Sequence, residues 1–399
     1  MPMRFLHLAD VHIGLRVTRF DDQVARKLKE ARFQALDNAL AVAANKKVDF
    51  VVIAGDLFDD NTVSLVDAQR AFDMLKNKRM PIFVLPGNHD PYCAGSVWQR
   101  HPWNDTSATT LKVLAAREAV LATESATLYP CPATSSRSRE DPTGWIPPRE
   151  QADGIRIGVA HGSVMDRATL PEDDHPIPQD AARARGLDYL ALGHWHQSKE
   201  YRETDGAARI AYPGTLEQMS FGSAADFSIG WAPYASGAER EEFCGAGLGQ
   251  ALLVQIAAPE AVPVLERVDT GQYVWQDESV SVSDDEHFQS TFAEIARRER
   301  PERCLLRLRV EGLLPAESML RLEGFREMLN RYLHCVLDAD GVSLVPDDSH
   351  VADVAGSGVV GEVYQRLKDD LATDLAEAER DRRERAVLVL YRLAQEVGE

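Results

Sequence analysis

Short runs of apolar residues recur through the first half of the chain, and each run ends at a cluster of polar residues. The runs are Phe5–Leu8, Phe50–Ala54, Pro81–Leu85, Ile155–Ala160 and Tyr189–Leu192. Nearly continuous apolar runs of this length predict strands that are covered on both faces of a sheet. Between the first three runs, apolar residues fall at helical spacing from about residue 22 to 45 and from about 64 to 78. The pattern therefore predicts repeated strand–loop–helix units.

The pattern changes in the second half of the chain. A Gly- and Ala-rich passage over 235–249 predicts a loop before the strand Leu252–Ile256. From about residue 280 the sequence predicts a β–α–β–α–β alternation, with helices near Glu286–Arg297 and Ala316–Tyr332 and a strand at Leu305–Val310. We infer three parts, which are a main domain over 1–278, a smaller β/α capping domain over 279–347 and a helical segment over 348–399.

The C-terminal segment is rich in charge and carries an apolar stripe at spacings of three and four residues. The stripe consists of Val360, Val363, Leu367, Leu371 and Leu375. Such a stripe packs either on its own domain or on a partner protein, and the sequence leaves both interpretations open.

Five polar motifs follow the five apolar runs. In chain order they are Asp10-Val11-His12, Gly55-Asp56, Gly87-Asn88-His89-Asp90, His161-Gly162 and Gly193-His194-Trp195-His196. In open α/β sheets ligands bind at the carboxyl ends of the strands, so we expect these side chains to lie close together. Each motif alone is a weak signal, but Asp, Asn and His at five strand ends predict a site for two metal ions.

Two metal ions would supply what phosphate ester hydrolysis needs. Held roughly 3.5–4 Å apart, they compensate the charge of the phosphate and lower the pKa of a bound water. Ions this close need a shared ligand, and Asp56 is the candidate because a carboxylate offsets their mutual repulsion. Asp10 and His12 stand two residues apart, as do His194 and His196, so each pair points the same way in extended backbone. Mixed nitrogen and oxygen ligands favour Mn²⁺, Zn²⁺ or Fe²⁺ over Ca²⁺.

Several other residues have both a structural and a functional interpretation. His7 lies inside the first strand, where a core histidine is favoured over a ligand. Trp98 and Trp103 fall in a predicted loop and are candidates for contact with a substrate, whereas Trp195 is expected to pack and fix its loop. His175 lies outside the motifs, and we expect it at the surface or in the capping domain.

Composition narrows the class of protein. The chain has 399 residues, 44% of them hydrophobic, which suffices for a sizeable core and two or three domains. No apolar stretch is long enough to span a membrane, and the first motif begins too early for a signal peptide, so we expect a cytoplasmic protein. The five scattered cysteines predict neither a disulfide framework nor a thiolate metal site. A formal net charge of −19 argues against tight, unaided binding of nucleic acid.

The five motifs, in this order, resemble those of the calcineurin-like metallophosphoesterase superfamily over about residues 1 to 220. The resemblance implies an α/β fold of the α+β type, a four-layer sandwich of mixed β-sheets flanked by helices. It also implies that His89 donates a proton to the leaving oxygen or stabilises the transition state, with Asp90 orienting it. The implied ligands are Asp10, His12, Asp56 and His196 for one metal, and Asp56, Asn88, His161 and His194 for the other.

A narrower resemblance concerns the segments 5–14, 54–59 and 212–215, which are similar to those of SbcD-type DNA repair nucleases. Within that type, residues 54–69 and 216–222 resemble the YhaO-like bacterial proteins. The resemblance implies DNA as the substrate, a capping domain, a homodimer and a C-terminal segment that docks on an SbcC-like ABC-type ATPase. Many such enzymes carry a histidine where this chain has Asp59, which either assists the metals or serves as a helix cap or exposed residue.

The sequence therefore favours a Mn²⁺-dependent, two-metal phosphodiesterase that hydrolyses DNA in repair, as an exonuclease or endonuclease. The alternative is a phosphodiesterase or phosphatase acting on small nucleotides, which would share the core and differ in its loops and cap. A third interpretation is a non-catalytic subunit of an ATPase complex. The complete set of proposed ligands together with His89 argues against this third interpretation.

Overall fold

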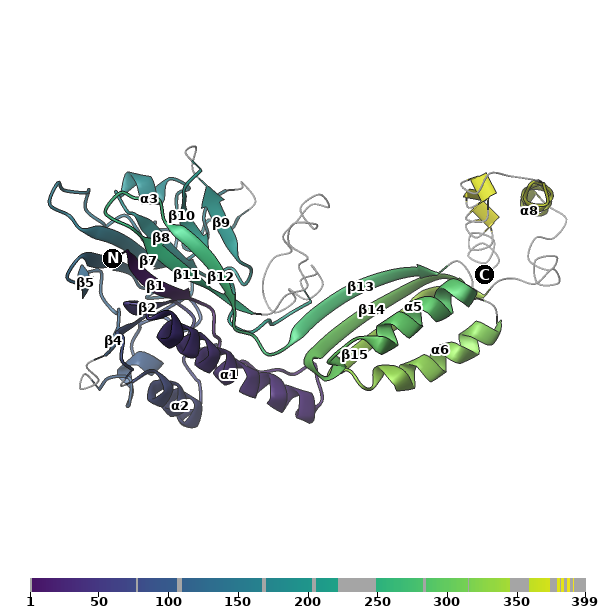
Figure 1. Ribbon diagram of the computed structural model, residues 1–399, viewed down its shortest axis with the longest axis horizontal. Helices are drawn as coiled ribbons and strands as arrows, with labels where there is room; N and C mark the ends of the chain where they lie inside the picture. Colours follow the sequence, from purple (N-terminus) through teal and green to yellow (C-terminus); the bar gives the residue numbers. More distant parts are fainter. Residues whose placement is uncertain are drawn as a thin grey trace. The chain divides into compact units, whose positions relative to one another are not determined.

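The computed structural model describes residues 2–76, 78–105, 110–166, 170–202, 206–221, 249–282, 285–314, 316–344 and 359–373, with isolated positions between 379 and 390. The chain forms two compact units (Figure 1). The first comprises Met1–Gln276 with Arg303–Leu305, and the second comprises Asp277–Glu302 with Leu306–Glu399. Among the helices described, none has the length and apolar character required to cross a membrane.

The first sheet of the larger unit has a parallel centre. Strands β1, β2, β3 and β4 run parallel to their neighbours, while β11 pairs antiparallel with β1 and β12 antiparallel with β11. In spatial order the strands are β12 (Val264–Asp269), β11 (Gln250–Ile256), β1 (Met3–Leu8), β2 (Phe50–Ala54), β3 (Ile82–Leu85) and β4 (Leu111–Val113).

The second sheet is also mixed. Strands β6, β7, β8 and β10 are parallel to one another, and the outer strands β5 and β9 are antiparallel to their neighbours. In spatial order the strands are β5 (Val120–Thr123), β6 (Ala126–Cys131), β7 (Ile155–His161), β8 (Tyr189–Gly193), β10 (Ala208–Tyr212) and β9 (Lys199–Arg202).

The two sheets pack face to face because successive side chains of their strands point to opposite faces. In β1, Phe5 joins the core between the sheets, together with Tyr189 of β8. Leu6 and Leu8 of the same strand instead join the core beneath helices α1 (Asp22–Lys46) and α2 (Leu65–Leu75). The short helix α3 (Ala181–Ala184) covers the outer face of the second sheet. The predicted four-layer sandwich of mixed sheets and helices is confirmed.

The smaller unit contains a three-stranded sheet in the order β13 (Val274–Val282), β14 (Cys304–Leu314), β15 (His334–Leu344). Helices α5 (Asp285–Arg297) and α6 (Ala316–Leu329) alternate with the strands along the chain, which confirms the predicted β–α–β–α–β order. Three phenylalanines meet between these helices, since the rings of Phe288 and Phe292 each contact Phe325.

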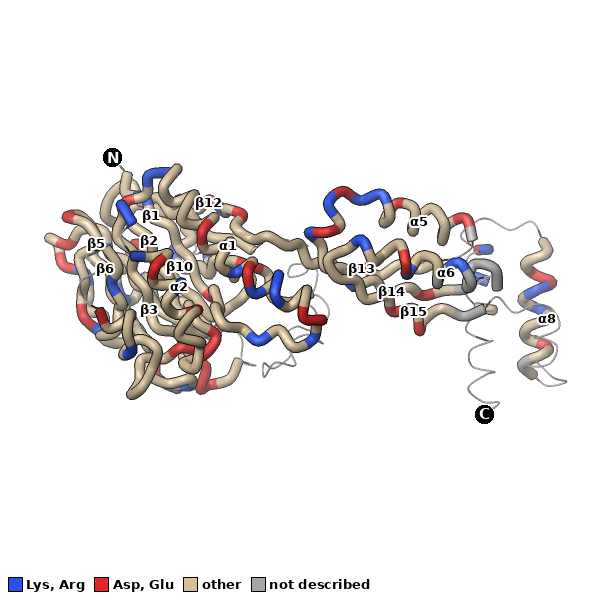
Figure 2. Tube along the Cα trace, turned by 90° about the horizontal axis from the view of Figure 1, so that it is seen from below, with Lys and Arg blue, Asp and Glu red and all other residues tan. Residues whose placement is uncertain are grey.

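Helix α8 (Val359–Leu371) is the described part of the C-terminal segment, and it exposes Val359 and Val363. Both basic and acidic residues lie along it (Figure 2). Leu375, like most of the Gly- and Ala-rich passage over 235–249, lies outside the described residues.

Candidate metal centre

The predicted site residues follow, or end, five strands of the two facing sheets. Because β2 packs against β7 and β8, the carboxyl ends of strands from both sheets meet at one place. Asp10 and His12 follow β1, Asp56 follows β2, Asn88, His89 and Asp90 follow β3, His161 ends β7, and His194 and His196 follow β8. Residues predicted from five separate motifs therefore lie together in space.

The backbone of these loops is held in unusual conformations by bonds between the motifs. Asp10, His12 and Asp56 have φ values of 53°, 50° and 53°, in the left-handed region that non-glycine residues rarely adopt. The N–H of His12 donates to the carbonyl oxygen of Asp56 at 3.0 Å. The N–H of His194 lies 3.0 Å from each carboxylate oxygen of Asp10. Strain of this kind persists only where the surroundings impose it, and it concentrates at functional sites.

Two glycines allow the loops to approach one another. A Cβ atom on Gly87 would lie 2.1 Å from the Oδ1 atom of Asp56, and one on Gly55 would lie 2.0 Å from the Nδ1 atom of His161. Both positions therefore require glycine because backbone passes directly against a proposed ligand.

One group of donor atoms gathers around His12. Its Nε2 atom lies 3.2 Å from the Nε2 atom of His196, 3.8 Å from the Oδ2 atom of Asp56 and 4.0 Å from the Oδ1 atom of Asp10. Asp10, His12 and Asp56 are almost completely buried. Two carboxylates and two imidazoles thus converge in a volume that one ion could occupy.

A second group gathers around Asn88. The Oδ1 atom of Asn88 lies 2.7 Å from the Nε2 atom of His161 and 3.0 Å from the Nδ1 atom of His194. The Nε2 atom of His161 also lies 3.2 Å from the Oδ2 atom of Asp56. The same Asp56 oxygen therefore faces both groups, as a bridging ligand requires.

The outer ring nitrogens of three histidines have partners of their own. The Nδ1 atom of His161 lies 2.9 Å from the carbonyl oxygen of Ala54. The Nε2 atom of His194 lies 3.0 Å from the Oδ2 atom of Asp174, and the Nδ1 atom of His12 lies 3.3 Å from the Oδ1 atom of Asp59. A carbonyl oxygen can only accept, so the hydrogen of a neutral His161 sits on Nδ1 and the lone pair of Nε2 faces the cluster.

The donor set fits cations. Burial raises the pKa of Asp10 well above its usual range, and the neighbouring Asp56 carboxylate adds to this against the opposing effect of His161. Burial alone would lower the pKa of His161, but Asp56 and Asp10 raise it to about 9. A proton on His161 thus compensates the two carboxylates, and a divalent ion bound among the same atoms would replace it.

His89 lies beside the cluster, and its side chain is 28% exposed, whereas those of His12, His161 and His194 are buried. Its backbone N–H donates to the Oδ1 atom of Asp56 at 2.9 Å, and the Nδ1 atom of its ring lies 2.8 Å from the carbonyl oxygen of Asp59. Its ring centroid is 4.8 Å from that of His12. The Asp59 carbonyl therefore orients this ring.

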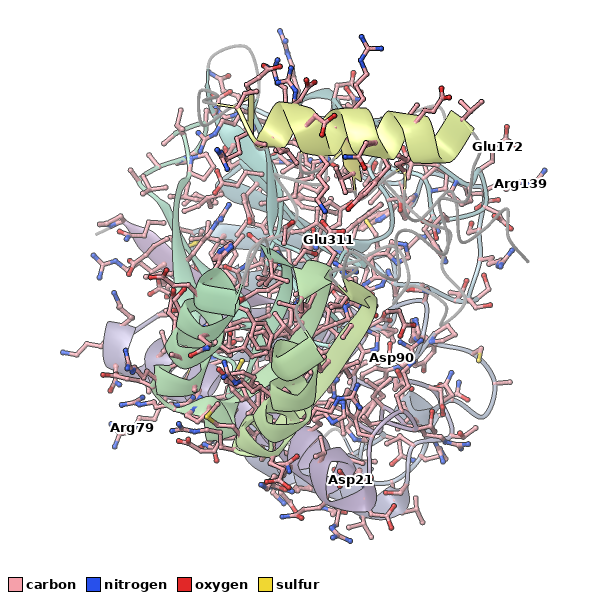
Figure 3. All side chains as sticks on the ribbon, turned by 90° about the vertical axis from the view of Figure 1, so that its right-hand side faces the viewer. Asp21, Arg79, Asp90, Arg139, Glu172 and Glu311 are labelled. Atoms are coloured by element: carbon pink, nitrogen blue, oxygen red, sulfur yellow. The ribbon has the colours of Figure 1, made fainter. Side chains whose placement is uncertain are left out.

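Asp90 (labelled in Figure 3) is fully buried, and its carboxylate binds backbone. Its oxygens accept the N–H groups of Phe58 at 2.9 Å and Gly87 at 2.7 Å. Burial, together with the nearby Asp56, raises the pKa of Asp90 to about 7. These contacts tie the loop after β2 to the loop after β3, and the role of Asp90 in orienting His89 stays a prediction.

The interpretation of the remaining residues is partly confirmed. His7 is a buried core histidine whose ring contacts the hydroxyl of Tyr189 and the carbonyl oxygen of Leu192, and burial lowers its pKa to about 3. Trp98 and Trp103 are not candidates for substrate contact, because they are only 2% and 5% exposed and their rings pack on Phe58.

Two carboxylates near the site were not assigned from the sequence. Asp174 was not predicted, and Asp59 had more than one interpretation. Asp174 lies in the connection between β7 and α3, 13 residues beyond the strand end at His161, so the strand end did not mark it. The neighbouring His175, expected at the surface, is 4% exposed because Gly162 packs directly against its backbone. Asp59 contacts two proposed site residues, so its interpretation as a simple helix cap or solvent-exposed residue is wrong.

Comparison with known proteins agrees with this geometry. Residues 3–198 match the family described as calcineurin-like phosphoesterase. The chain is 24% identical to the metallophosphoesterase YhaO of Bacillus subtilis (strain 168) over 225 residues, which cover 54% of this chain and 53% of that protein.

Two relatives are described as DNA double-strand break repair protein Mre11. The protein of Methanopyrus kandleri is 26% identical over 411 residues, covering 94% of this chain and 85% of the relative. The protein of Saccharolobus solfataricus is 25% identical over 221 residues, covering 54% of this chain and 55% of the relative. The matches with YhaO and the Saccharolobus protein thus span about half the length of those relatives. Since the family match contains every strand and loop that builds the cluster, the chain contains a calcineurin-like metallophosphoesterase domain.

Proposed function

We propose that this protein is a two-metal phosphodiesterase that hydrolyses DNA. The observation that carries the proposal is the position of the Asp56 Oδ2 atom, which faces two groups of nitrogen and oxygen donors at once. Such an arrangement suits a pair of ions about 3.5–4 Å apart. Mn²⁺ is the proposed metal, with Zn²⁺ and Fe²⁺ as alternatives compatible with the same ligands.

In this proposal the ligands divide as the two groups suggest. One ion takes Asp10, His12, Asp56 and His196, and the other takes Asp56, Asn88, His161 and His194. When bound, the ions supply charge compensation for the phosphate and activation of water.

His89 then acts on the leaving group. In the imidazolium form its Nδ1–H would donate to the Asp59 carbonyl, while the proton on Nε2 would pass to the departing oxygen and leave the ring neutral. Its partly exposed ring is accessible to a substrate, unlike the buried rings of His12, His161 and His194.

DNA as the substrate is supported by the relatives described as DNA double-strand break repair proteins. The Methanopyrus kandleri match extends over 94% of this chain and so includes the smaller unit. We extend the proposal to a role in DNA repair in the cytoplasm, as a dimeric nuclease subunit whose C-terminal segment docks on an ATPase of the ABC type. A partner with a basic surface would also offset the net charge of −19, which disfavours unaided binding to DNA.

The test is digestion of end-labelled linear duplex and single-stranded DNA with Mn²⁺ by wild type and by His89→Ala. Degradation by wild type alone is expected, and the pattern of label gives the polarity. A small aryl phosphodiester is assayed in parallel with the same preparations. Metal-dependent cleavage of this small ester with both DNAs intact, also after addition of the ATPase partner, would contradict DNA as the substrate and favour a nucleotide phosphodiesterase.

A further inference from the structure

We propose that Asp174 is a positioning residue that fixes the orientation and tautomer of His194 and so sets the affinity of the second metal subsite. That subsite is defined by Asn88, His161, His194 and the shared Asp56. The inference rests on the proposed two-metal function and adds a residue to it that lies outside the five motifs.

The first step concerns the ring of His194, whose two nitrogens face chemically different partners. Its Nε2 atom lies 3.0 Å from the Oδ2 atom of Asp174, and its Nδ1 atom lies 3.0 Å from the Oδ1 atom of Asn88. An imidazole that binds a cation through one nitrogen carries its single hydrogen on the other. A carboxylate can only accept, which places that hydrogen on Nε2 and leaves the lone pair of Nδ1 for a cation.

The second step concerns how Asp174 itself is held. The hydroxyl of Ser163 donates to its Oδ2 atom at 2.5 Å, and the indole N–H of Trp195 donates to the Ser163 hydroxyl oxygen at 3.2 Å. These contacts run from Trp195 through Ser163 and Asp174 back to His194, the residue that precedes Trp195. The loop that contains His194 and Trp195 therefore also helps to hold the Asp174 carboxylate in place, through the hydroxyl of Ser163.

The backbone of the Asp174 loop is fixed as well. The N–H of Ser163 donates to the carbonyl oxygen of Asp174 at 3.2 Å, and the N–H of His175 donates to the carbonyl oxygen of Ser138 at 3.0 Å. A Cβ atom on Gly162 would lie 2.2 Å from the carbonyl oxygen of His175, so the loop lies directly against the backbone that follows His161. A loop bound on both sides can hold a carboxylate within hydrogen-bonding distance of a ligand.

The third step concerns charge. His161, the other histidine of this subsite, has a neutral carbonyl as its outer partner, whereas His194 has a full negative charge. A carboxylate partner makes the imidazole a stronger donor, and removing such a partner typically costs about 10–100-fold in metal affinity. Asp174 is therefore expected to affect the second subsite more than the first.

The chain offers a matched control in the adjacent Asp173, whose side chain is 36% exposed and pairs with the exposed Arg137 at 3.2 Å. We compare Asp174→Asn with Asp173→Asn, because both changes remove one charge and keep the shape of the side chain. Mn²⁺ binding to the metal-free proteins is measured by titration calorimetry and by electron paramagnetic resonance. The melting temperature is recorded with and without Mn²⁺.

Wild type and Asp173→Asn are expected to bind two Mn²⁺ ions with the same affinities. Asp174→Asn is expected to bind one ion as wild type does and the other about 10–100-fold more weakly, with an unchanged melting temperature in the absence of metal. Ser163→Ala, which removes the hydroxyl that links Trp195 to Asp174, should weaken the same ion to a smaller extent.

Unchanged binding of both ions by Asp174→Asn would overturn the inference while leaving the proposed function intact. Equal weakening of both ions, or a lower melting temperature without metal, would also overturn it by showing a general structural role. If wild type itself bound fewer than two Mn²⁺ ions, the two-metal function would fail independently of Asp174.

Discussion

The two units of this protein use charged residues in opposite ways. In the larger unit, charged and polar side chains such as Asp10, His12 and Asp56 are buried, and their backbone is held at positive φ. In the smaller unit, the described ion pairs lie nearer the surface, as in the pair of Arg298 with Glu278, whose side chains are 28% and 29% exposed. In the larger unit, buried charge and positive φ at the site cost free energy of folding. The smaller unit is organised by apolar packing, as between Phe288, Phe292 and Phe325.

The largest effect is expected for Asp56→Ala in the larger unit. Loss of the shared carboxylate should abolish binding of both ions and lower the rate of phosphodiester hydrolysis by at least about a thousandfold, because two-metal charge stabilisation is worth several kcal/mol. Metal analysis and the rate of phosphodiester cleavage measure this. Asp60→Ala, four residues away, is the control, and two ions retained by Asp56→Ala would rule out the bridging role.

His89→Ala should separate chemistry from metal binding. Both ions should remain bound, while kcat falls by about 10²–10⁴-fold because the leaving oxygen loses its proton donor. The matched change in the smaller unit is His287→Ala, an exposed position on α5 that should leave the rate unaltered. A fully active His89→Ala would show that the proton comes from another group.

The buried Glu217 should make the free energy of unfolding of the larger unit depend on pH. Its side chain accepts the N–H groups of Gln272 and Tyr273, and burial raises its pKa from 4.5 to about 7. The folded state therefore binds more protons than the unfolded state between these values, so the free energy of unfolding should decrease as pH rises from about 4.5 to 7, by up to about 3 kcal/mol. Glu217→Gln should flatten this dependence in urea unfolding, and an identical slope in the variant would assign it to other groups.

The smallest effect is expected for Glu278→Gln in the smaller unit. Its two carboxylate oxygens accept from Arg298 at 2.6 and 2.9 Å, but solvent screens the pair. The free energy of unfolding should fall by less than about 1 kcal/mol, with no change in metal binding. A loss of several kcal/mol in chemical denaturation would contradict the contrast between the units.

The larger architecture and the site could be predicted because both rest on local patterns. Strands β1, β2, β3, β7 and β8 are buried along nearly their whole length, so their sequences are continuously apolar and their ends mark the ligands. Strand β12 could not be predicted in this way, because most of its residues are exposed and leave no apolar signal.

The residues around the site were harder to predict than the site itself. Asp174 reaches His194 only because its loop pairs with Ser163 and Ser138, and such loop-to-loop contacts depend on tertiary structure rather than on periodicity. The prediction of substrate contact by Trp98 and Trp103 is wrong for the same reason, since tertiary packing buries both rings against Phe58.

The bonds between the N–H of His194 and the carboxylate of Asp10 join residues that are 184 positions apart in the sequence. During synthesis the chain emerges from its N-terminus, so Asp10 and His12 leave the ribosome long before their partners at His194 and His196 exist. A complete coordination shell therefore cannot form on the nascent chain until β8 and the loop after it have emerged. Loading of the proposed ions would consequently wait until strands of both sheets, up to β8, have been made.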